Sequence, residues 1–198
     1  KKLLSSNLDN LQEKQLQGLQ WTVKHAYHGS DAFRKKLDEL NLKPDVIQSI
    51  DDLQRLPFTS PKDLSDGYPF PLLSVPYENV SRIHTSSGTT GKRKVLCYTK
   101  KDIQDWVQFF TRCFEFAGLN AEDRVQIAVG YGPWTAGISF QTACEAFGAM
   151  AIPAGPGDSE TQIEFLIDFQ STVLCCTASM GLLMSEEVQR KGIRDQIN

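Results

Sequence analysis

The first part of the chain carries apolar residues at helical spacing and predicts two packed helices. The apolar positions of the first helix are Leu8, Leu11, Leu16, Leu19, Val23 and Ala26. Glycine commonly ends a helix, so Gly29 is the expected stop. Ser30 is then the expected N-cap of a second helix, because serine hydroxyls accept from free backbone N–H groups. The apolar positions of that second helix are Phe33, Leu37 and Leu40.

Proline breaks the pattern between residues 44 and 76. The prolines of this segment are Pro44, Pro57, Pro61, Pro69, Pro71 and Pro76. Proline has no backbone N–H and clashes inside a helix, so no long helix or strand is expected here. The segment is predicted to be an ordered, wrapped linker.

After this linker, short apolar runs alternate with helical patterns. The expected strands cover residues 80–85, 94–98, 124–129, 149–152 and 172–176. Helices are expected from Thr99 to Gly118, from about residue 136, and over residues 159–170. Thr99 and Asp102 have the spacing of an N-terminal capping pair. The last three strands are nearly continuous apolar runs, which is typical of strands buried on both faces.

The pattern therefore predicts an α/β fold: a helical N-terminal segment followed by a mostly parallel sheet with flanking helices and right-handed crossovers. We expect residues 1–78 to form the helical segment and Pro-rich linker, and residues 79–198 to form the α/β part. The chain begins at Lys1 rather than Met and stops within a helical pattern, so we also expect a fragment of a longer protein.

Composition narrows the class of protein. The 198 residues include 21 Lys and Arg against 24 Asp and Glu, which gives a formal charge of −3 and no field for capturing nucleic acid. With 40% hydrophobic residues the chain can bury a core, yet no apolar run reaches the roughly 18 residues of a membrane span. The N-terminus lacks a signal peptide's apolar region. The 5 cysteines show no CxxC spacing, so we expect buried thiols, no metal site and a cytoplasmic location.

Residues 85–94, TSSGTTGKRK, carry the strongest chemical signal. Glycines let backbone N–H groups turn toward an anion, hydroxyls add donors, and cations supply charge. The loop donors are Ser86, Ser87, Gly88, Thr89, Thr90 and Gly91, and the cations are Lys92, Arg93 and Lys94. A Walker A loop is excluded because Ser86 and Arg93 break its pattern and a strand follows. The alternative interpretation is a polar turn between two strands.

A second candidate segment, GYGPWTAG, follows the expected strand at residues 124–129. Ligands of open α/β sheets bind beyond the carboxyl ends of strands, where an aromatic side chain among small residues can line a flat apolar pocket. The candidate lining residues are Tyr131, Trp134, Ala136 and Gly137. The same residues also suit an ordinary packed loop. His84, directly before the hydroxyl-rich loop, either orients that loop or fills its strand.

The chain resembles the adenylate-forming superfamily of acyl-CoA synthetases, whose phosphate-binding signature is similar to IHTSSGTTGKRK. The wider match resembles the N-terminal part of the phenylacetate-CoA ligase branch. The segments that carry it are LPFTSPKDLSDGYPF (56–70), RIHTSSGTTGK (82–92), YTKKDIQDW (98–106), GYGPWTAG (130–137) and ETQIEFLIDF (160–169).

This resemblance implies a two-step reaction of an aryl acid, with phenylacetate the expected acid. The carboxylate attacks the α-phosphate of ATP, and the thiol of coenzyme A then displaces AMP, with Mg²⁺ as the metal. By resemblance, residues 86–91 hold the β- and γ-phosphates, Lys94 is the catalytic loop lysine, and residues 130–137 line the aryl site. The resemblance also implies that the magnesium ligand, the ribose-binding residue and the C-terminal catalytic lysine lie beyond Asn198. Small-molecule partners and a homodimer are expected. The alternative function is a noncatalytic nucleotide- or polyphosphate-binding module.

Overall fold

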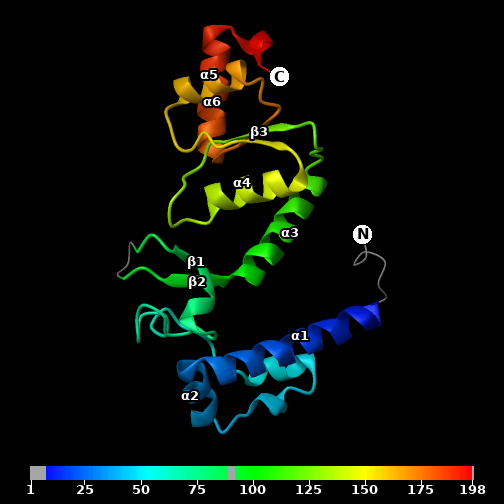
Figure 1. Ribbon diagram of the computed structural model, residues 1–198, viewed down its shortest axis with the longest axis vertical. Coiled ribbons are helices and arrows are strands. Elements are labelled where there is room, and N and C mark those ends of the chain that lie inside the picture. Colours follow the sequence, from blue (N-terminus) through cyan, green and yellow to red (C-terminus); the bar gives the residue numbers. More distant parts are fainter. Residues whose placement is uncertain (1–7, 89–91, 198) are drawn as a thin grey trace. The chain divides into compact units, whose positions relative to one another are not determined.

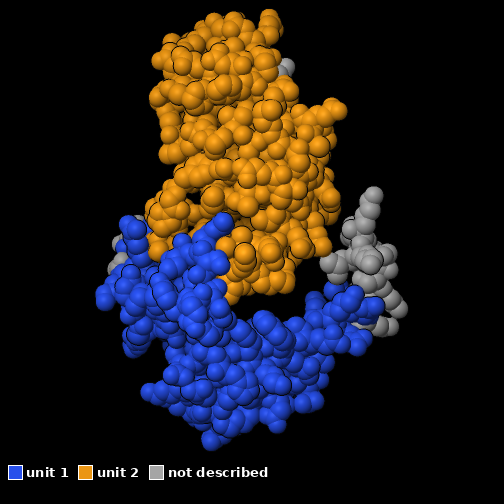
Figure 2. Space-filling model, viewed as in Figure 1, with its two compact units in different colours: residues 1–83, 87–97 blue, residues 84–86, 98–198 orange. Residues whose placement is uncertain are grey.

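The computed structural model describes residues 8–88 and 92–197. The chain forms two compact units, shown in separate colours in Figure 2. The first contains Lys1–Ile83 and Ser87–Cys97, and the second contains His84–Ser86 and Tyr98–Asn198. Each unit is therefore assembled from two separate stretches of chain. The boundary expected near residue 79 stays a prediction.

Two helices build the first unit, as the apolar spacing predicted. Helix α1 spans Leu8–Gly29 and α2 spans Asp31–Glu39, and the Ser30 side chain caps α2 by accepting from Phe33 N. Gly29 is the last residue of α1, but its φ is not positive. Instead, a Cβ at Gly29 would lie 2.0 Å from the Ser74 carbonyl oxygen, so glycine is needed for this close approach. A core cluster contains Val23, Tyr27, Leu37 and Ile47.

The Pro-rich segment is ordered by short helical turns and polar contacts. Its 3₁₀ helices span Pro44–Val46, Ile50–Arg55 and Tyr77–Asn79. At the start of the second of these 3₁₀ helices, Asp52 accepts from the backbone N–H groups of Gln48 at 3.0 Å and Ser49 at 2.8 Å.

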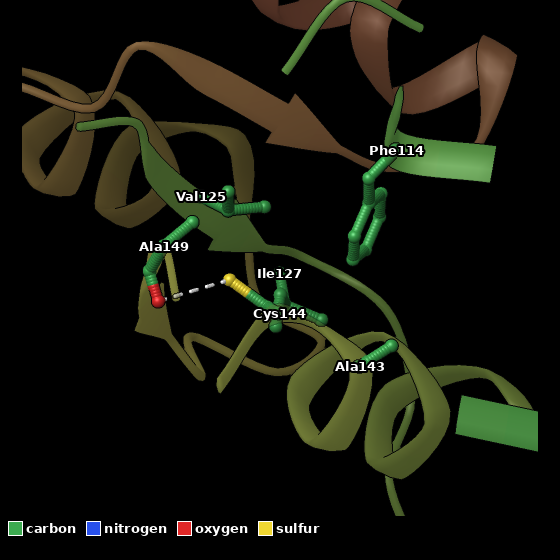
Figure 3. Close-up of a cluster of buried hydrophobic side chains, with 6 residues drawn as sticks. All are labelled: Phe114, Val125, Ile127, Ala143, Cys144 and Ala149. Carbon is green, nitrogen blue, oxygen red and sulfur yellow. Dashed lines mark hydrogen bonds between the residues drawn. The ribbon is translucent and has the colours of Figure 1, made fainter. Parts of the chain in front are cut away.

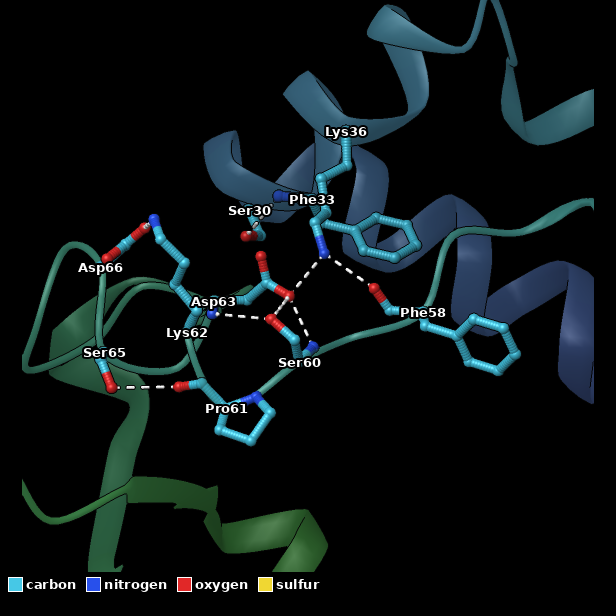
Figure 4. Close-up of polar contacts among 10 residues, drawn as sticks. All are labelled: Ser30, Phe33, Lys36, Phe58, Ser60, Pro61, Lys62, Asp63, Ser65 and Asp66. Carbon is cyan, nitrogen blue, oxygen red and sulfur yellow. Dashed lines mark hydrogen bonds and ion pairs between the residues drawn. The ribbon is translucent and has the colours of Figure 1, made fainter. Parts of the chain in front are cut away.

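A second polar cluster ties the segment to α2 (Figure 4). Asp63 accepts from the Ser60 hydroxyl at 2.7 Å and pairs with Lys36 at 2.6 Å. Lys36 also donates to the Phe58 carbonyl at 2.8 Å. These contacts fix the backbone of the segment without a long helix or strand, and its role as a linker stays a prediction.

A strand pair and a long helix connect the two units. Strands β1 (Val80–Thr85) and β2 (Val95–Thr99) form a two-stranded sheet, followed by α3 (Lys100–Phe116). At the start of α3, Asp102 N donates to Thr99 Oγ1 at 3.2 Å, and Thr99 N donates to Asp102 Oδ2 at 2.8 Å. This is the predicted capping box, and it closes the backbone donors at the start of the helix.

A parallel sheet with helices on both faces forms the rest of the second unit. Its strands, which pair in the order β4-β3-β5, are β3 (Arg124–Ile127), β4 (Met150–Ile152) and β5 (Val173–Cys175). Its helices are α4 (Ala136–Phe147), α5 (Ser159–Asp168) and α6 (Ala178–Lys191). In Figure 1, α4 lies on one side of β3, whereas α5 and α6 lie on the other. The predicted parallel α/β layer is confirmed. No helix among the described residues is long and apolar enough to cross a bilayer.

The two faces of this sheet have separate cores. Val125 and Ile127 pack with residues of α3 and α4, where buried Cys144 contacts the Ala149 carbonyl at 3.6 Å (Figure 3). On the opposite face, residues of α5 and α6 pack together with Leu174. Helix α4, which follows β3, and helix α5, which follows the neighbouring strand β4, therefore lie on opposite faces of the sheet.

Candidate functional site

An aromatic cluster fixes the end of β1. His84 is only 2% exposed, and its ring centroid lies 5.2 Å from that of Tyr98 and 5.4 Å from that of Trp106. The Tyr98 and Trp106 rings lie 5.1 Å apart, so all three form one packed group. Such aromatic contacts are favourable beyond their buried area. His84 thus joins β1, β2 and α3 immediately before the hydroxyl-rich loop.

One backbone hydrogen bond joins the two segments that the sequence singled out. Thr85 N, at the start of the hydroxyl-rich loop, donates to Pro133 O in the aromatic loop at 2.8 Å. Thr85, Ser86 and the aromatic loop belong to the same compact unit. The bond links residues 48 positions apart in the chain, and no signal in the sequence indicates it. It places the first donors of one loop beside the carboxyl end of β3.

The described part of the hydroxyl-rich loop contains exposed hydroxyls and a glycine in the left-handed conformation. Ser86 and Ser87 are exposed, and Gly88 has φ +74°. A left-handed glycine turns consecutive N–H groups toward one point, which is the geometry that binds phosphate oxygens. Thr89, Thr90 and Gly91, which we expected to continue the cradle, lie outside the described residues.

The loop cations lie against the Pro-rich segment within the first unit. Lys94 is half-buried, and its Nζ lies 3.2 Å from the Ser65 hydroxyl and 3.1 Å from the Lys92 carbonyl. Lys92 Nζ lies 5.1 Å from the centre of the Tyr68 ring, a cation–π distance. Sequence reasoning did not select Ser65 or Tyr68 as site residues, although both lie in the segment 56–70 that carries the family resemblance.

The aromatic loop is folded tightly over its own glycines. A Cβ at Gly137 would lie 2.7 Å from Tyr131 Cδ2, and one at Gly130 would lie 3.7 Å from Trp134 Cδ1. Gly137 N also donates to Gly130 O at 3.1 Å, which closes the loop onto the start of α4. Trp134 is 38% exposed. The structure therefore packs Gly137 against the Tyr131 ring, and it packs Gly130 against the Trp134 ring.

The remaining lining candidate, Ala136, is half-buried at the first position of α4.

Within the described part of the chain, three buried hydroxyls of this unit have no hydrogen-bond partner, namely Thr85 Oγ1, Tyr131 Oη and Ser139 Oγ. A buried hydroxyl without a partner is costly, so such groups are suited to bind a polar ligand. Burial raises the pKa of the Tyr131 phenol, and the negative charge of Glu145 adds to this shift. Tyr131 consequently remains a neutral donor at physiological pH.

Cys144 and Cys175 behave as core residues, whereas Cys113 is exposed, so the expectation of buried thiols is wrong for Cys113. Burial raises the pKa of Cys144 and of Cys175 to about 11, so both remain protonated thiols. Within residues 8–88 and 92–197, no group of three or more His, Cys, Asp or Glu side chains could hold a metal ion.

The sequence is similar to those of known acid–thiol ligases. It is 40% identical to the phenylacetate-coenzyme A ligase of Escherichia coli (strain K12) over 187 residues, which cover 94% of this chain and 43% of that protein. The chain is related to the phenylacetate-coenzyme A ligases. The phenylacetate-coenzyme A ligase of Pseudomonas putida is 37% identical over 189 residues, 96% of this chain and 43% of that relative. The chain thus spans less than half the length of these ligases. No protein-family model matches it.

Solved structures confirm the fold class. A crystal structure of 2-hydroxyisobutyryl-CoA ligase in complex with 2-HIB-AMP and CoA superposes with a TM-score of 0.86 and 21% identity, over 95% of this chain and 41% of that one. The same ligase in its postadenylation state gives a TM-score of 0.84 and 20% identity, over 93% and 40% of the two chains. The fold of this chain is therefore that of part of these solved CoA ligase structures.

Proposed function

We propose that the chain is the ATP-phosphate- and aryl-binding part of an AMP-forming acid–thiol ligase that joins an aryl acid to coenzyme A. Phenylacetate is the proposed acid, since the curated relatives are phenylacetate-coenzyme A ligases. The observation that carries this proposal is the Thr85 N–H to Pro133 O hydrogen bond of 2.8 Å. It links Thr85, which directly precedes the proposed phosphate donors, to the aromatic loop within one compact unit.

The first step joins two anions, a carboxylate and a triphosphate, so charge and geometry both have to be controlled. The cradle of Ser86, Ser87 and Gly88 offers hydroxyl and backbone donors for the phosphate oxygens, and the proposed role of Lys94 is to supply positive charge. Charge-assisted hydrogen bonds are roughly twice as strong as neutral ones. Fixing both reactants also removes much of the entropic cost of their encounter.

The aromatic loop supplies the second half of the proposed site. Tyr131, Trp134, Ala136 and Gly137 form an apolar wall, and the buried Tyr131 hydroxyl is a donor for a polar group of the acid. The residues described fit the phosphates and an aryl ring. They do not provide a Mg²⁺ ligand set, because no cluster of acidic side chains lies among them. Magnesium, when bound, neutralises phosphate charge during the reaction, and we propose that its ligands lie outside this chain.

The test is acid-dependent exchange of pyrophosphate into ATP by the full-length protein. Exchange requires adenylate formation, so an adenylating ligase shows it with phenylacetate. Gly88→Val is expected to abolish it, because valine does not adopt the left-handed backbone of Gly88. Lys94→Ala is expected to lower it about 100-fold or more, in line with the loss of one oriented charge stabiliser.

Lys101→Ala is the matched control, since Lys101 is an exposed lysine that pairs with Asp105 on α3. Its exchange rate should equal that of the unaltered protein. Heat of ATP binding without any acid-dependent exchange would instead support the noncatalytic nucleotide- or polyphosphate-binding module. A screen of phenylacetate, benzoate, hydroxyphenylacetate and indoleacetate identifies the acid. A homodimer and a cytoplasmic location stay predictions.

A further inference from the structure

A buried polar network lies on the α5 face of the sheet. Gln126 of β3, Gln162 of α5 and Ser171 are 0%, 1% and 2% exposed. Gln126 Nε2 donates to Gln162 Oε1 at 2.7 Å and to the Gln162 carbonyl at 3.0 Å. Ser171 Oγ donates to Gln126 Oε1 at 3.0 Å. Burying two amides is costly unless each is paired, so this network specifies one arrangement of α5 against β3.

The network ends on a glycine of the loop that follows β4. Gln162 Nε2 donates to the Gly155 carbonyl at 3.0 Å, and Gly155 N donates to the Ile127 carbonyl at 2.9 Å. Both backbone polar groups of Gly155 are thereby held, one by α5 and the other by the last residue of β3. Gly155 has φ +71°, a conformation that favours glycine.

Gly155 lies against the proposed acid site. A Cβ built on it would be 3.9 Å from Tyr131 Cδ2, which is van der Waals contact. Tyr131 follows β3 and Gly155 follows β4, the two neighbouring strands whose connections run on opposite faces of the sheet. The carboxyl ends of such a strand pair form the crevice in which α/β sheets bind ligands.

We propose that Gly155 is a specificity-determining residue for the acid and that Gln162 is a positioning residue that holds Gly155 beside Tyr131. The proposal rests on the function proposed above. The missing side chain at Gly155 leaves a methyl-sized space at the edge of the Tyr131 ring, where the aryl group of an acid would contact that ring, and the buried amide of Gln162 holds Gly155 at this distance.

The test compares three variants of the full-length protein in the pyrophosphate exchange assay. Gln162→Met keeps the length of the side chain but loses its hydrogen bonds to Gly155 and Gln126. Loss of the bond to Gly155 is expected to raise KM for phenylacetate about fivefold to tenfold, the equivalent of one hydrogen bond, and to leave KM for ATP within about twofold. Ser171→Ala removes the other end of the network without touching Gly155. It should lower the melting temperature and leave both KM values within about twofold.

Gly155→Ala tests the space itself by comparing phenylacetate with propionate. The added methyl group should lower the ratio of kcat/KM for phenylacetate to that for propionate about tenfold or more. This ratio does not depend on the fraction of Gly155→Ala that is folded. It therefore still tests the proposal if Gln162→Met does not fold.

An unchanged acid preference in Gly155→Ala would overturn the proposal. So would equal changes of KM for acid and ATP in Gln162→Met, or the same KM shifts in Ser171→Ala. If the unaltered protein exchanges pyrophosphate with aryl acids, these results overturn only the roles of Gly155 and Gln162. An unaltered protein that shows no exchange with any aryl acid overturns the function and these roles together.

Discussion

Replacement of Gly137 by alanine is the sharpest test of the aromatic loop. The new Cβ would lie 2.7 Å and 2.8 Å from Tyr131 Cδ2 and Cγ and 2.9 Å from the Gly130 carbonyl oxygen. Carbon atoms in good contact are about 3.5–4.0 Å apart, so the overlap with the ring approaches about 1 Å. Neither obstacle is the end of a flexible side chain, because one is an aromatic ring next to its own backbone and the other is a backbone carbonyl.

The expected cost follows from two opposing effects. Overpacking of this kind typically costs about 1–3 kcal/mol. Alanine in place of a helical glycine stabilises the helix by at most about 1 kcal/mol. The free energy of unfolding should therefore fall by about 1–2 kcal/mol, and displacement of Tyr131 should raise KM for the acid more than KM for ATP.

Urea unfolding of the full-length protein measures this change. Gly18→Ala is the matched control, because Gly18 lies within α1 and a Cβ there would have nothing within 4 Å. That substitution should stabilise the protein by about 0.5–1 kcal/mol. If Gly137→Ala proves as stable as Gly18→Ala, Tyr131 does not pack on α4 as described.

Three further predictions concern caps, acid stability and thiols. Thr99→Ala removes the side-chain acceptor of Asp102 N and should destabilise α3 by about 1 kcal/mol in urea unfolding, so an unchanged midpoint would contradict the capping role. Two backbone N–H groups lower the pKa of Asp52 to about 2. The Asp52 carboxylate therefore contributes its full stabilisation above pH 3.8, its ordinary pKa, and this contribution declines as the pH falls toward 2. The difference in the free energy of unfolding between the unaltered protein and Asp52→Asn should close over that range, and a constant difference would refute this. At pH 8, an alkylating reagent should modify exposed Cys113 in the folded protein but reach buried Cys144 only after unfolding, as mass spectrometry can show.

Local signals in the sequence were sufficient to predict much of the fold. Strand β1 has the predicted bounds, and Ser30 and Thr99 cap the helices that they were expected to cap. These features depend on neighbouring residues only, so a short stretch of sequence determines them. The parallel α/β class was also predictable, because apolar runs alternate with helical patterns after residue 120.

Long-range features could not be predicted in the same way. The position of β3 between β4 and β5 depends on which strands pair, and the apolar runs of all three strands are alike. Gln126 lies in one of those runs and is fully buried, because its amide finds partners on α5 that are distant in the chain. Of the candidate site, the two loops were recognisable from their composition. Their connection through Thr85 and Pro133 depends on a backbone bond, which no side-chain pattern records.

The strands β1 and β2 have a practical consequence for anyone who wishes to study one half of this protein alone. Each strand starts in one compact unit and finishes in the other, so no single truncation point separates the two. Cutting the chain after residue 83 would remove residues 87–97 from the first unit and leave them attached to the second unit. A clean separation needs an internal excision that joins Ser86 directly to Tyr98.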